Sequence, residues 1–274
     1  MASQWERLLK NAGTWIGSFT QLSPTGAELA DAPSETILNP QEQGQLMRQE
    51  VRRFPPDAPV QETVLEYRSL GKGVLFCESG AFSQGSIQWG PFGDFGAELG
   101  LIAGNERLRL VQLFKGERTL SSITLIREHL QGSTPQKRPA LNTDQLVGTW
   151  QGEAETVFPD LQPAQRYETR LEIQSIAADQ IQQTLTFGSA PPIQSTGRIE
   201  QNTLRFDQGA QPVTVLMLPG GASATFPTSI VSGQPLFLEA GWLIQPDWRQ
   251  RLIRTYSAHG SWVSLTLVNE RKVA

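Results

Sequence analysis

The chain has 274 residues, of which 38% are hydrophobic and 18% charged, and its net charge is −4. This length allows two domains of ordinary size, and the composition is typical of a folded protein rather than a disordered one. The mild acidity gives no electrostatic reason to expect a nucleic acid or an anionic membrane as a partner.

No targeting or membrane segment is expected. Residues 1–7 lack the apolar run of a secretory signal, and no stretch reaches the roughly 18 apolar residues of a membrane span. The single cysteine, Cys77, has no second cysteine with which to form an internal disulfide. We therefore expect a reduced, cytoplasmic setting.

Short runs of alternating apolar and polar residues predict antiparallel strands along the whole chain. The clearest runs are residues 64–67, 73–76, 107–114, 120–128, 170–173, 184–187, 203–206, 249–256 and 262–270. Short helical stretches are expected at residues 5–9 and 143–146. A sheet of eight to ten strands leaves exposed edges unless it closes on itself, so the pattern favours β-barrels.

The two halves of the chain repeat one another. The motif Gly-Thr-Trp-x-Gly occurs at residues 13–17 and again at 148–152, and residues 107–114 align without gaps with 249–256. The repeat makes Arg107 equivalent to Arg249, Arg109 to Arg251, and Glu128 to Glu270. We therefore predict a duplication, with one barrel in residues 1–132, a linker at 133–141 and a second barrel in 142–274.

A Gly-x-Trp motif on the first strand of an antiparallel barrel, after a short helical turn, resembles the lipocalin signature. The resemblance implies that Trp15 and Trp150 close one end of their barrels and are buried there. It also implies that a basic residue of the last strand packs across each ring, which would be Arg127 over Trp15 and Arg271 or Lys272 over Trp150. The other lipocalin motifs and disulfides are absent.

Nearly the whole chain is similar to an uncharacterised cyanobacterial family with two calycin (lipocalin-like) barrels in tandem. Residues 18–26, 79–86 and 95–101 carry this similarity. The resemblance implies an all-β fold of two calycin barrels, each with a short N-terminal helix. Related calycins include the lyases that attach bilins to phycobiliproteins, but their own motifs are not evident here.

Catalytic and metal-binding patterns are sparse. We expect His129, just after the last strand of the first half, and His259, in a turn, to be surface residues without a catalytic role. Cys77 aligns with Leu218, which favours core packing over reactivity. No metal-ligand spacing, nucleophile elbow, P-loop or dinucleotide fingerprint is present, and no particular cofactor is indicated.

The strongest indication of a ligand site is the aromatic and glycine-rich run at residues 89–95 in the first half. Trp89, Phe92 and Phe95 either offer flat apolar surfaces to a ligand or plug a barrel corner. A hairpin turn at residues 103–106 would bring Arg109 near Glu98.

The polar residues of this region also allow two interpretations. Arg109 and Glu98 either form a polar anchor inside the barrel or belong to a solvated face. In the second half the same argument pairs Arg254 with Glu239. We place the ligand site in the first barrel, with Tyr67 as a further hydrogen-bonding group. The stretch 219–227 in the second half is interpreted as a loop.

Three functions are compatible with these features. The first is the binding of a small, mostly apolar molecule, such as a pigment, an isoprenoid or an acyl chain, in a barrel cavity. The second is an enzyme or chaperone that acts on such a molecule, like a bilin lyase or a cyclase. The third is a scaffold or assembly protein with filled barrels, and a protein partner or a homodimer stays open.

Overall fold

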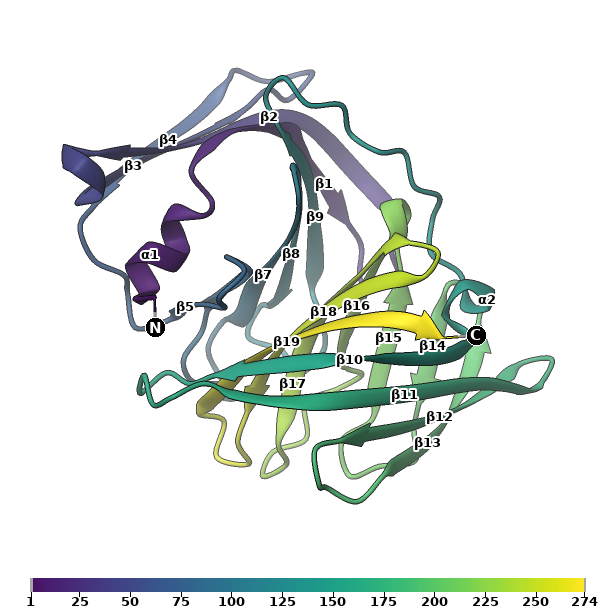
Figure 1. Ribbon diagram of the computed structural model, residues 1–274. Helices are drawn as coiled ribbons and strands as arrows, with labels where there is room; N and C mark the ends of the chain where they lie inside the picture. Colours follow the sequence, from purple (N-terminus) through teal and green to yellow (C-terminus); the bar gives the residue numbers. More distant parts are fainter. Residues whose placement is uncertain (1, 274) are drawn as a thin grey trace.

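The computed structural model describes residues 2–273, which form two antiparallel sheets and very little helix (Figure 1). The first sheet contains nine strands in the order β4-β3-β2-β1-β9-β8-β7-β6-β5. These strands are β1 (Gly13–Leu22), β2 (Glu28–Gln41), β3 (Leu46–Arg53), β4 (Gln61–Tyr67), β5 (Val74–Phe76), β6 (Phe82–Gly85), β7 (Phe95–Ala103), β8 (Glu106–Phe114) and β9 (Ser122–Leu130). Helix α1 (Gln4–Leu9) precedes them, and a 3-10 turn η1 (Glu42–Gly44) joins β2 to β3.

The second sheet is a closed barrel of ten strands. They are β10 (Gly148–Val157), β11 (Gln165–Ala177), β12 (Gln180–Phe187), β13 (Ile193–Glu200), β14 (Thr203–Phe206), β15 (Val213–Met217), β16 (Ala222–Pro227), β17 (Leu236–Gln245), β18 (Trp248–Tyr256) and β19 (Trp262–Val273). Helix α2 (Thr143–Leu146) and a 3-10 turn η2 (Pro219–Gly221) complete this half. The all-β prediction is confirmed, and β14 and α2 occupy the predicted residues.

The first sheet curls but does not close, because β4 and β5 are not paired with each other. In the barrel, β14 pairs with both β13 and β15 and completes the ring. The chain between β4 and β5, residues 68–73, forms turns instead and contains Gly71 and Gly73. We call the first sheet the half-barrel, the second the closed barrel, and the gap between β4 and β5 the seam.

Helix α1 lies at one end of the seam and contacts both of its edges (Figure 1). The Gln4 side-chain amide donates to the carbonyl of Phe76 (3.1 Å) and accepts from its N–H (2.7 Å), so it pairs with the edge strand β5 as a neighbouring strand would. Trp5 packs edge-on against Tyr67 of β4, with ring centroids 6.0 Å apart. The helix begins at Ser3, whose side chain forms a capping box with Glu6.

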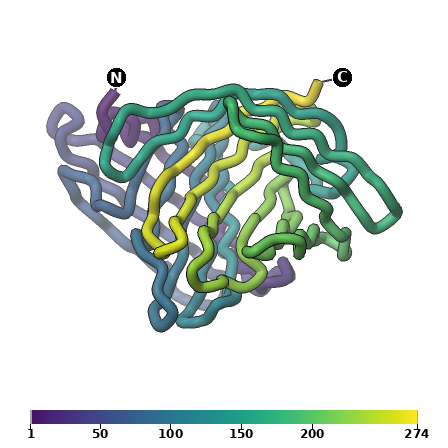
Figure 2. The backbone as a smooth tube through the Cα atoms, turned by 90° about the horizontal axis from the view of Figure 1, so that it is seen from below, coloured from purple at the N-terminus to yellow at the C-terminus, as the bar shows by residue number. Residues whose placement is uncertain are grey.

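The main hydrophobic core lies between the two sheets, which pack face against face (Figure 2). Leu99, Leu110 and Leu125 of the half-barrel belong to the same buried cluster as Leu238 and Leu265 of the closed barrel. Each sheet therefore buries its outer face against the other. The division into domains at residues 132 and 142 stays a prediction, since the two halves share this core.

Two expectations about the second half are wrong, for the same reason. Part of residues 219–227 forms strand β16, and its residues Ala222, Ala224 and Phe226 are buried in the shared core rather than in a loop. The sheet-to-sheet contact, which the sequence pattern did not reveal, needs small apolar side chains at this point.

Arg254 does not pair with Glu239, because Glu239 lies opposite Ile253 and alternation turns Arg254 to the outer face. There it is fully buried and donates to the carbonyls of Gly73, Gly85 and Ser86 and to the Ser83 hydroxyl, at 3.0–3.3 Å. Its guanidinium also lies 3.4 Å from the centroid of the Trp262 ring. Burial lowers the pKa of this arginine. Arg254 thus fastens the closed barrel to the β5–β6 edge of the half-barrel.

Trp15 and Trp150 are buried as the lipocalin resemblance implied, with 2% and 0% exposure. Each indole N–H donates to a carbonyl at the end of the preceding helical turn, Asn11 (2.9 Å) and Leu146 (2.8 Å).

The expected cation over Trp150 is confirmed for Lys272, at 5.2 Å, and Arg249 also lies over this ring at 4.6 Å. The expected Arg127–Trp15 contact is wrong. Arg127 lies opposite Ser18 and faces away, so Arg107 of β8 covers Trp15 instead, at 4.3 Å. Arg271 lies over Trp248 rather than Trp150.

Replacing Trp15 or Trp150 by alanine is expected to lower the free energy of unfolding by roughly 3–5 kcal/mol, because each change empties a buried site and removes a ring that supports a buried arginine. Chemical denaturation measures the effect. Phe92→Ala is the control, since Phe92 is 95% exposed and its loss should change little. A loss below 1 kcal/mol at Trp15 would show that the ring does not support the end of the half-barrel.

Candidate functional site

The half-barrel encloses a cavity of about 490 Å³ beneath α1. Its wall comes from α1, strands β1–β8 and residues 69–71, and about half of the lining residues are apolar. The apolar lining residues are Leu8, Phe19, Leu38, Val51, Leu65, Leu70, Val74, Phe76 and Phe82. Leu65 and Val74 lie on the two sides of the seam, so the cavity reaches the gap between β4 and β5.

A group of charged residues forms the opposite wall of this cavity. The Glu128 carboxylate is fully buried and accepts hydrogen bonds from Arg107 Nε (2.8 Å), Arg109 Nε (3.0 Å), Arg109 Nη2 (2.8 Å) and the Thr36 hydroxyl (2.9 Å). Arg109 Nη1 donates to Glu98 Oε1 at 2.8 Å. All three nitrogens of Arg109 are therefore occupied within the protein.

Burial alone would raise the pKa of Glu128, but the charges and hydrogen bonds of Arg107 and Arg109 outweigh it and lower that pKa to about 2. The Glu128 carboxylate is therefore ionised at neutral pH. It holds the two arginines in place, and Glu98, Arg107 and Arg109 of this group line the cavity.

Three of the six predicted site residues meet in this cavity. Tyr67, Glu98 and Arg109 line it, and Glu98 contacts Arg109 as the hairpin argument predicted. Trp89 and Phe95 instead belong to the core between the sheets, and Phe92 is 95% exposed. The aromatic run therefore does not line this cavity.

Sequence reasoning missed six further polar residues of the site: Asn11, Thr36, Gln49, Ser69, Gln84 and Arg107. Arg107 was found as a repeated residue but was not assigned to a site. Thr36 and Gln49 lie on β2 and β3, where no strand was identified, so no signal connected them with Glu128 or Tyr67. Gln49 accepts a hydrogen bond from the Tyr67 hydroxyl at 3.0 Å.

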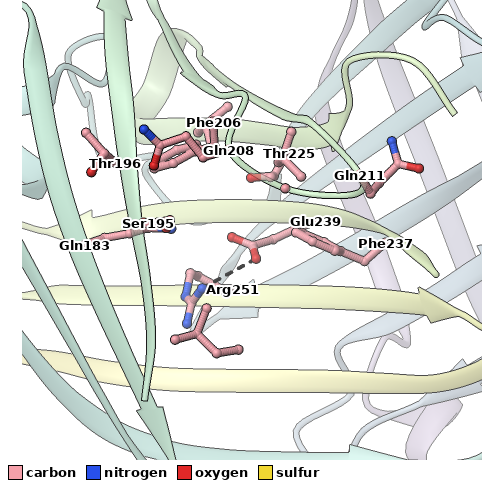
Figure 3. Close-up of a pocket in the computed structure, with 14 residues that line it drawn as sticks. Gln183, Ser195, Thr196, Phe206, Gln208, Gln211, Thr225, Phe237, Glu239 and Arg251 are labelled. Atoms are coloured by element: carbon pink, nitrogen blue, oxygen red, sulfur yellow. Dashed lines mark hydrogen bonds and ion pairs between the residues drawn. The ribbon is translucent and has the colours of Figure 1, made fainter. Parts of the chain in front are cut away.

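The closed barrel contains an equivalent charged group and a smaller cavity of about 280 Å³ (Figure 3). Glu270 Oε1 accepts from Arg249 Nε (2.6 Å) and Arg251 Nε (3.1 Å), as Glu128 accepts from Arg107 and Arg109. Arg251 and Glu239 face each other at 3.5 Å in the cavity, as the dashed line in Figure 3 shows. Burial raises the pKa of Glu239, and Arg251 offsets this only in part.

Nothing in residues 2–273 forms a group of three or more His, Cys, Asp or Glu side chains placed to hold a metal ion. The same residues contain no helix long and apolar enough to cross a membrane. His129 lies within β9 rather than after it, and neither histidine lines the two cavities. Cys77 is fully buried in the shared core, and burial raises the pKa of its thiol, as expected for a packing residue.

The free energy of unfolding is expected to decrease at low pH because Glu128 becomes protonated. Its pKa is lowered from 4.5 to about 2 on folding, so its contribution is complete above pH 4.5 and is lost as the pH falls toward 2. The lost contribution is on the order of 3 kcal/mol.

Denaturation at a series of pH values measures this, and Glu128→Gln should flatten the acid limb. The matched control is Glu62→Gln, which removes a half-exposed partner of Arg52 and should cost at most about 1 kcal/mol. Identical acid limbs in the wild type and Glu128→Gln would contradict the assignment.

The two halves match two family profiles. Residues 1–133 match the N-terminal domain of unknown function DUF3598, and residues 137–273 match the C-terminal domain of biogenesis factor required for ATP synthase 1. No functionally curated protein matches the chain.

Among solved structures, a DUF3598 protein of unknown function from Nostoc punctiforme is 47% identical over 100% of both chains, with a TM-score of 0.94. An S-type phycobiliprotein lyase from Guillardia theta is 15% identical over 48% of this chain and 90% of its own, with a TM-score of 0.38. A putative outer membrane protein from Bacteroides fragilis is 12% identical over 97% and 99%, with a TM-score of 0.27. The last two are too distant to support an argument about function. The resemblance to an uncharacterised family is confirmed, and the chain belongs to the DUF3598 family.

Proposed function

We propose that the half-barrel binds a small, mostly apolar molecule of the pigment, isoprenoid or acyl type. The observation that supports this most directly is the cavity of about 490 Å³, whose lining contains nine apolar side chains, one charged group and two uncharged polar side chains without a partner in the described residues, Ser69 and Gln84. Pockets of this composition hold apolar ligands and orient them with a few polar contacts. Asn11, Thr36, Gln49 and Tyr67 line the cavity too, but each already hydrogen-bonds within the protein.

The polar end of the ligand is expected to be a hydrogen-bond donor. Each nitrogen of Arg109 already donates within the protein, whereas Glu98 Oε2 has no partner among the described residues and the Glu98 side chain is 23% exposed. A hydroxyl or N–H group of the ligand would satisfy this oxygen. A ligand carboxylate would instead be repelled by Glu98.

Access to the cavity is expected through the seam. Leu65 lines the cavity and is still 50% exposed, which places it at the opening. Since β4 and β5 are not hydrogen-bonded to each other, a ligand can pass between them without breaking the sheet. Helix α1 covers one end of the seam through Gln4 and Trp5.

Titration with retinol tests this proposal, because retinol joins an apolar polyene to a terminal hydroxyl and its fluorescence reports burial. Val51→Trp fills the half-barrel cavity and should weaken retinol binding at least tenfold. Val215→Trp fills the closed-barrel cavity and serves as the matched control. Retinoic acid, with the same body and a carboxylate end, should bind more weakly than retinol.

Two outcomes would count against this site. If Val51→Trp and Val215→Trp bind retinol as the wild type does, the ligand does not occupy the half-barrel cavity. If retinoic acid binds more tightly than retinol, Glu98 is not the polar anchor. Phe92→Ala should leave binding unchanged, since Phe92 points into solvent.

The family profile of the second half favours a second candidate, an assembly protein. The match to a biogenesis factor covers residues 137–273, which include the whole closed barrel described here. Native mass spectrometry with an absorption spectrum of protein purified from its source organism separates the two candidates. A bound coloured or acyl molecule supports ligand binding, and an unliganded mass in repeated preparations supports assembly.

A further inference from the structure

The cavity of the closed barrel differs in chemistry from that of the half-barrel. Uncharged polar side chains contribute much of its lining, and in residues 2–273 they have no hydrogen-bond partner. These side chains are Gln183, Ser195, Gln208 and Thr225 (Figure 3). Thr225 is only 5% exposed, so its unpartnered hydroxyl belongs to the barrel interior. The half-barrel cavity contrasts with this, because most of its polar groups are already paired.

The charged pair in this cavity also has unused hydrogen-bonding groups. Arg251 donates through Nε to Glu270 and through Nη1 to Glu239 at 3.5 Å, but within the described chain its Nη2 has no partner. Glu239 Oε1 likewise has none. The equivalent Arg109 uses all three nitrogens, and its contact with Glu98 is shorter, at 2.8 Å.

One difference between equivalent residues of the two halves explains why the charged group of the closed barrel has fewer hydrogen bonds. Thr36 lies opposite Trp15 on β2 and donates to Glu128, whereas Leu171 lies opposite Trp150 on β11. Leucine has no hydroxyl to donate, and Glu270 Oε2 is buried without a partner. Arg249 Nη2 is also buried and unpartnered, but so is its equivalent in the half-barrel, Arg107 Nη2, so the difference lies in Glu270, Arg251 and Glu239. The closed barrel therefore leaves more polar capacity unsatisfied than the half-barrel does.

We propose that the closed barrel binds an uncharged, hydroxyl-rich molecule of about the size of a monosaccharide. Amide and hydroxyl side chains both donate and accept, which matches hydroxyl groups, and Arg251 and Glu239 add one strong donor and one strong acceptor. Two arginines and two glutamates carry no net charge when both carboxyls are ionised, so the group does not select an ion. Phe206 and Phe237 offer flat surfaces to the C–H face of a ring.

Access to this site is over the loop that joins β14 to β15. Gln208, Gly209 and Gln211 of this loop line the cavity, and Gln208 and Gly209 are exposed. Gln211 is the one member fixed by side-chain hydrogen bonds, to the Ser229 carbonyl (2.7 Å) and the Val231 N–H (3.0 Å). This site is in the other sheet from the apolar cavity and does not depend on the function proposed for that cavity.

Binding is tested with the full chain, using myo-inositol, D-glucose and D-galactose as probes and cyclohexanol as the ring without its other hydroxyls. Calorimetry or ligand-observed NMR should show saturable binding of at least one of the three polyols and none of cyclohexanol. Thr225→Val and Gln183→Leu, which keep the side-chain shape and remove hydrogen bonds, should each weaken that binding at least fivefold.

Val51→Trp is the matched control, because it fills the half-barrel cavity and should leave polyol binding unchanged. The proposal is overturned if none of the three polyols saturates the protein, or if the affinity is the same in Thr225→Val and Gln183→Leu as in the wild type. It is also overturned if cyclohexanol binds as tightly as myo-inositol.

Discussion

The contact between the outer faces of the two sheets determines which side chains face the interiors of the half-barrel and the closed barrel. Side chains alternate between the faces of a strand, so a strand that gives its leucines to the neighbouring sheet must turn its other residues inward. On β8, Leu108 and Leu110 pack in the shared core, and Arg107 and Arg109 therefore face the interior of the half-barrel. The same alternation on β18 sends Leu252 outward and Arg251 inward.

Arginines that face a barrel interior need carboxylates, because a buried charge without a partner costs several kcal/mol. Glu128 and Glu270 on the last strand of each half meet this requirement. Arg254 is the exception that faces the shared core. It has no carboxylate there and donates to backbone carbonyls of the half-barrel instead. These hydrogen bonds add to the contacts between the two sheets.

Much of the local structure could be predicted from the sequence. The strand at residues 203–206, the helix at 143–146 and the hairpin that brings Arg109 to Glu98 all follow from alternation, capping and turn residues. The repeat also indicated that Arg251 is equivalent to Arg109. These features depend on neighbours in sequence or on one strand pairing.

What could not be predicted depends on contacts between distant elements. Alternation on β18 shows that Arg254 and Leu252 share a face, but it does not show whether that face is inside a barrel or against another sheet. For the same reason the aromatic run was assigned to a ligand, whereas Trp89 and Phe95 fill the contact between sheets. The open seam could not be predicted either. Residues 68–73 occupy the place in the half-barrel that β14 occupies in the closed barrel, and only the strand pairing shows that they do not form a strand.

Because only the half-barrel has a seam, the two cavities differ in how wide a ligand they can accept. Every strand of the closed barrel is bonded on both sides, so its circumference is fixed and a wider molecule would have to break a ladder of backbone hydrogen bonds. The half-barrel can widen by moving β4 away from β5, and the contacts of α1, including those of Gln4, Trp5 and Arg7, oppose that movement at one end. One chain thus combines a compartment of adjustable width with one of set width.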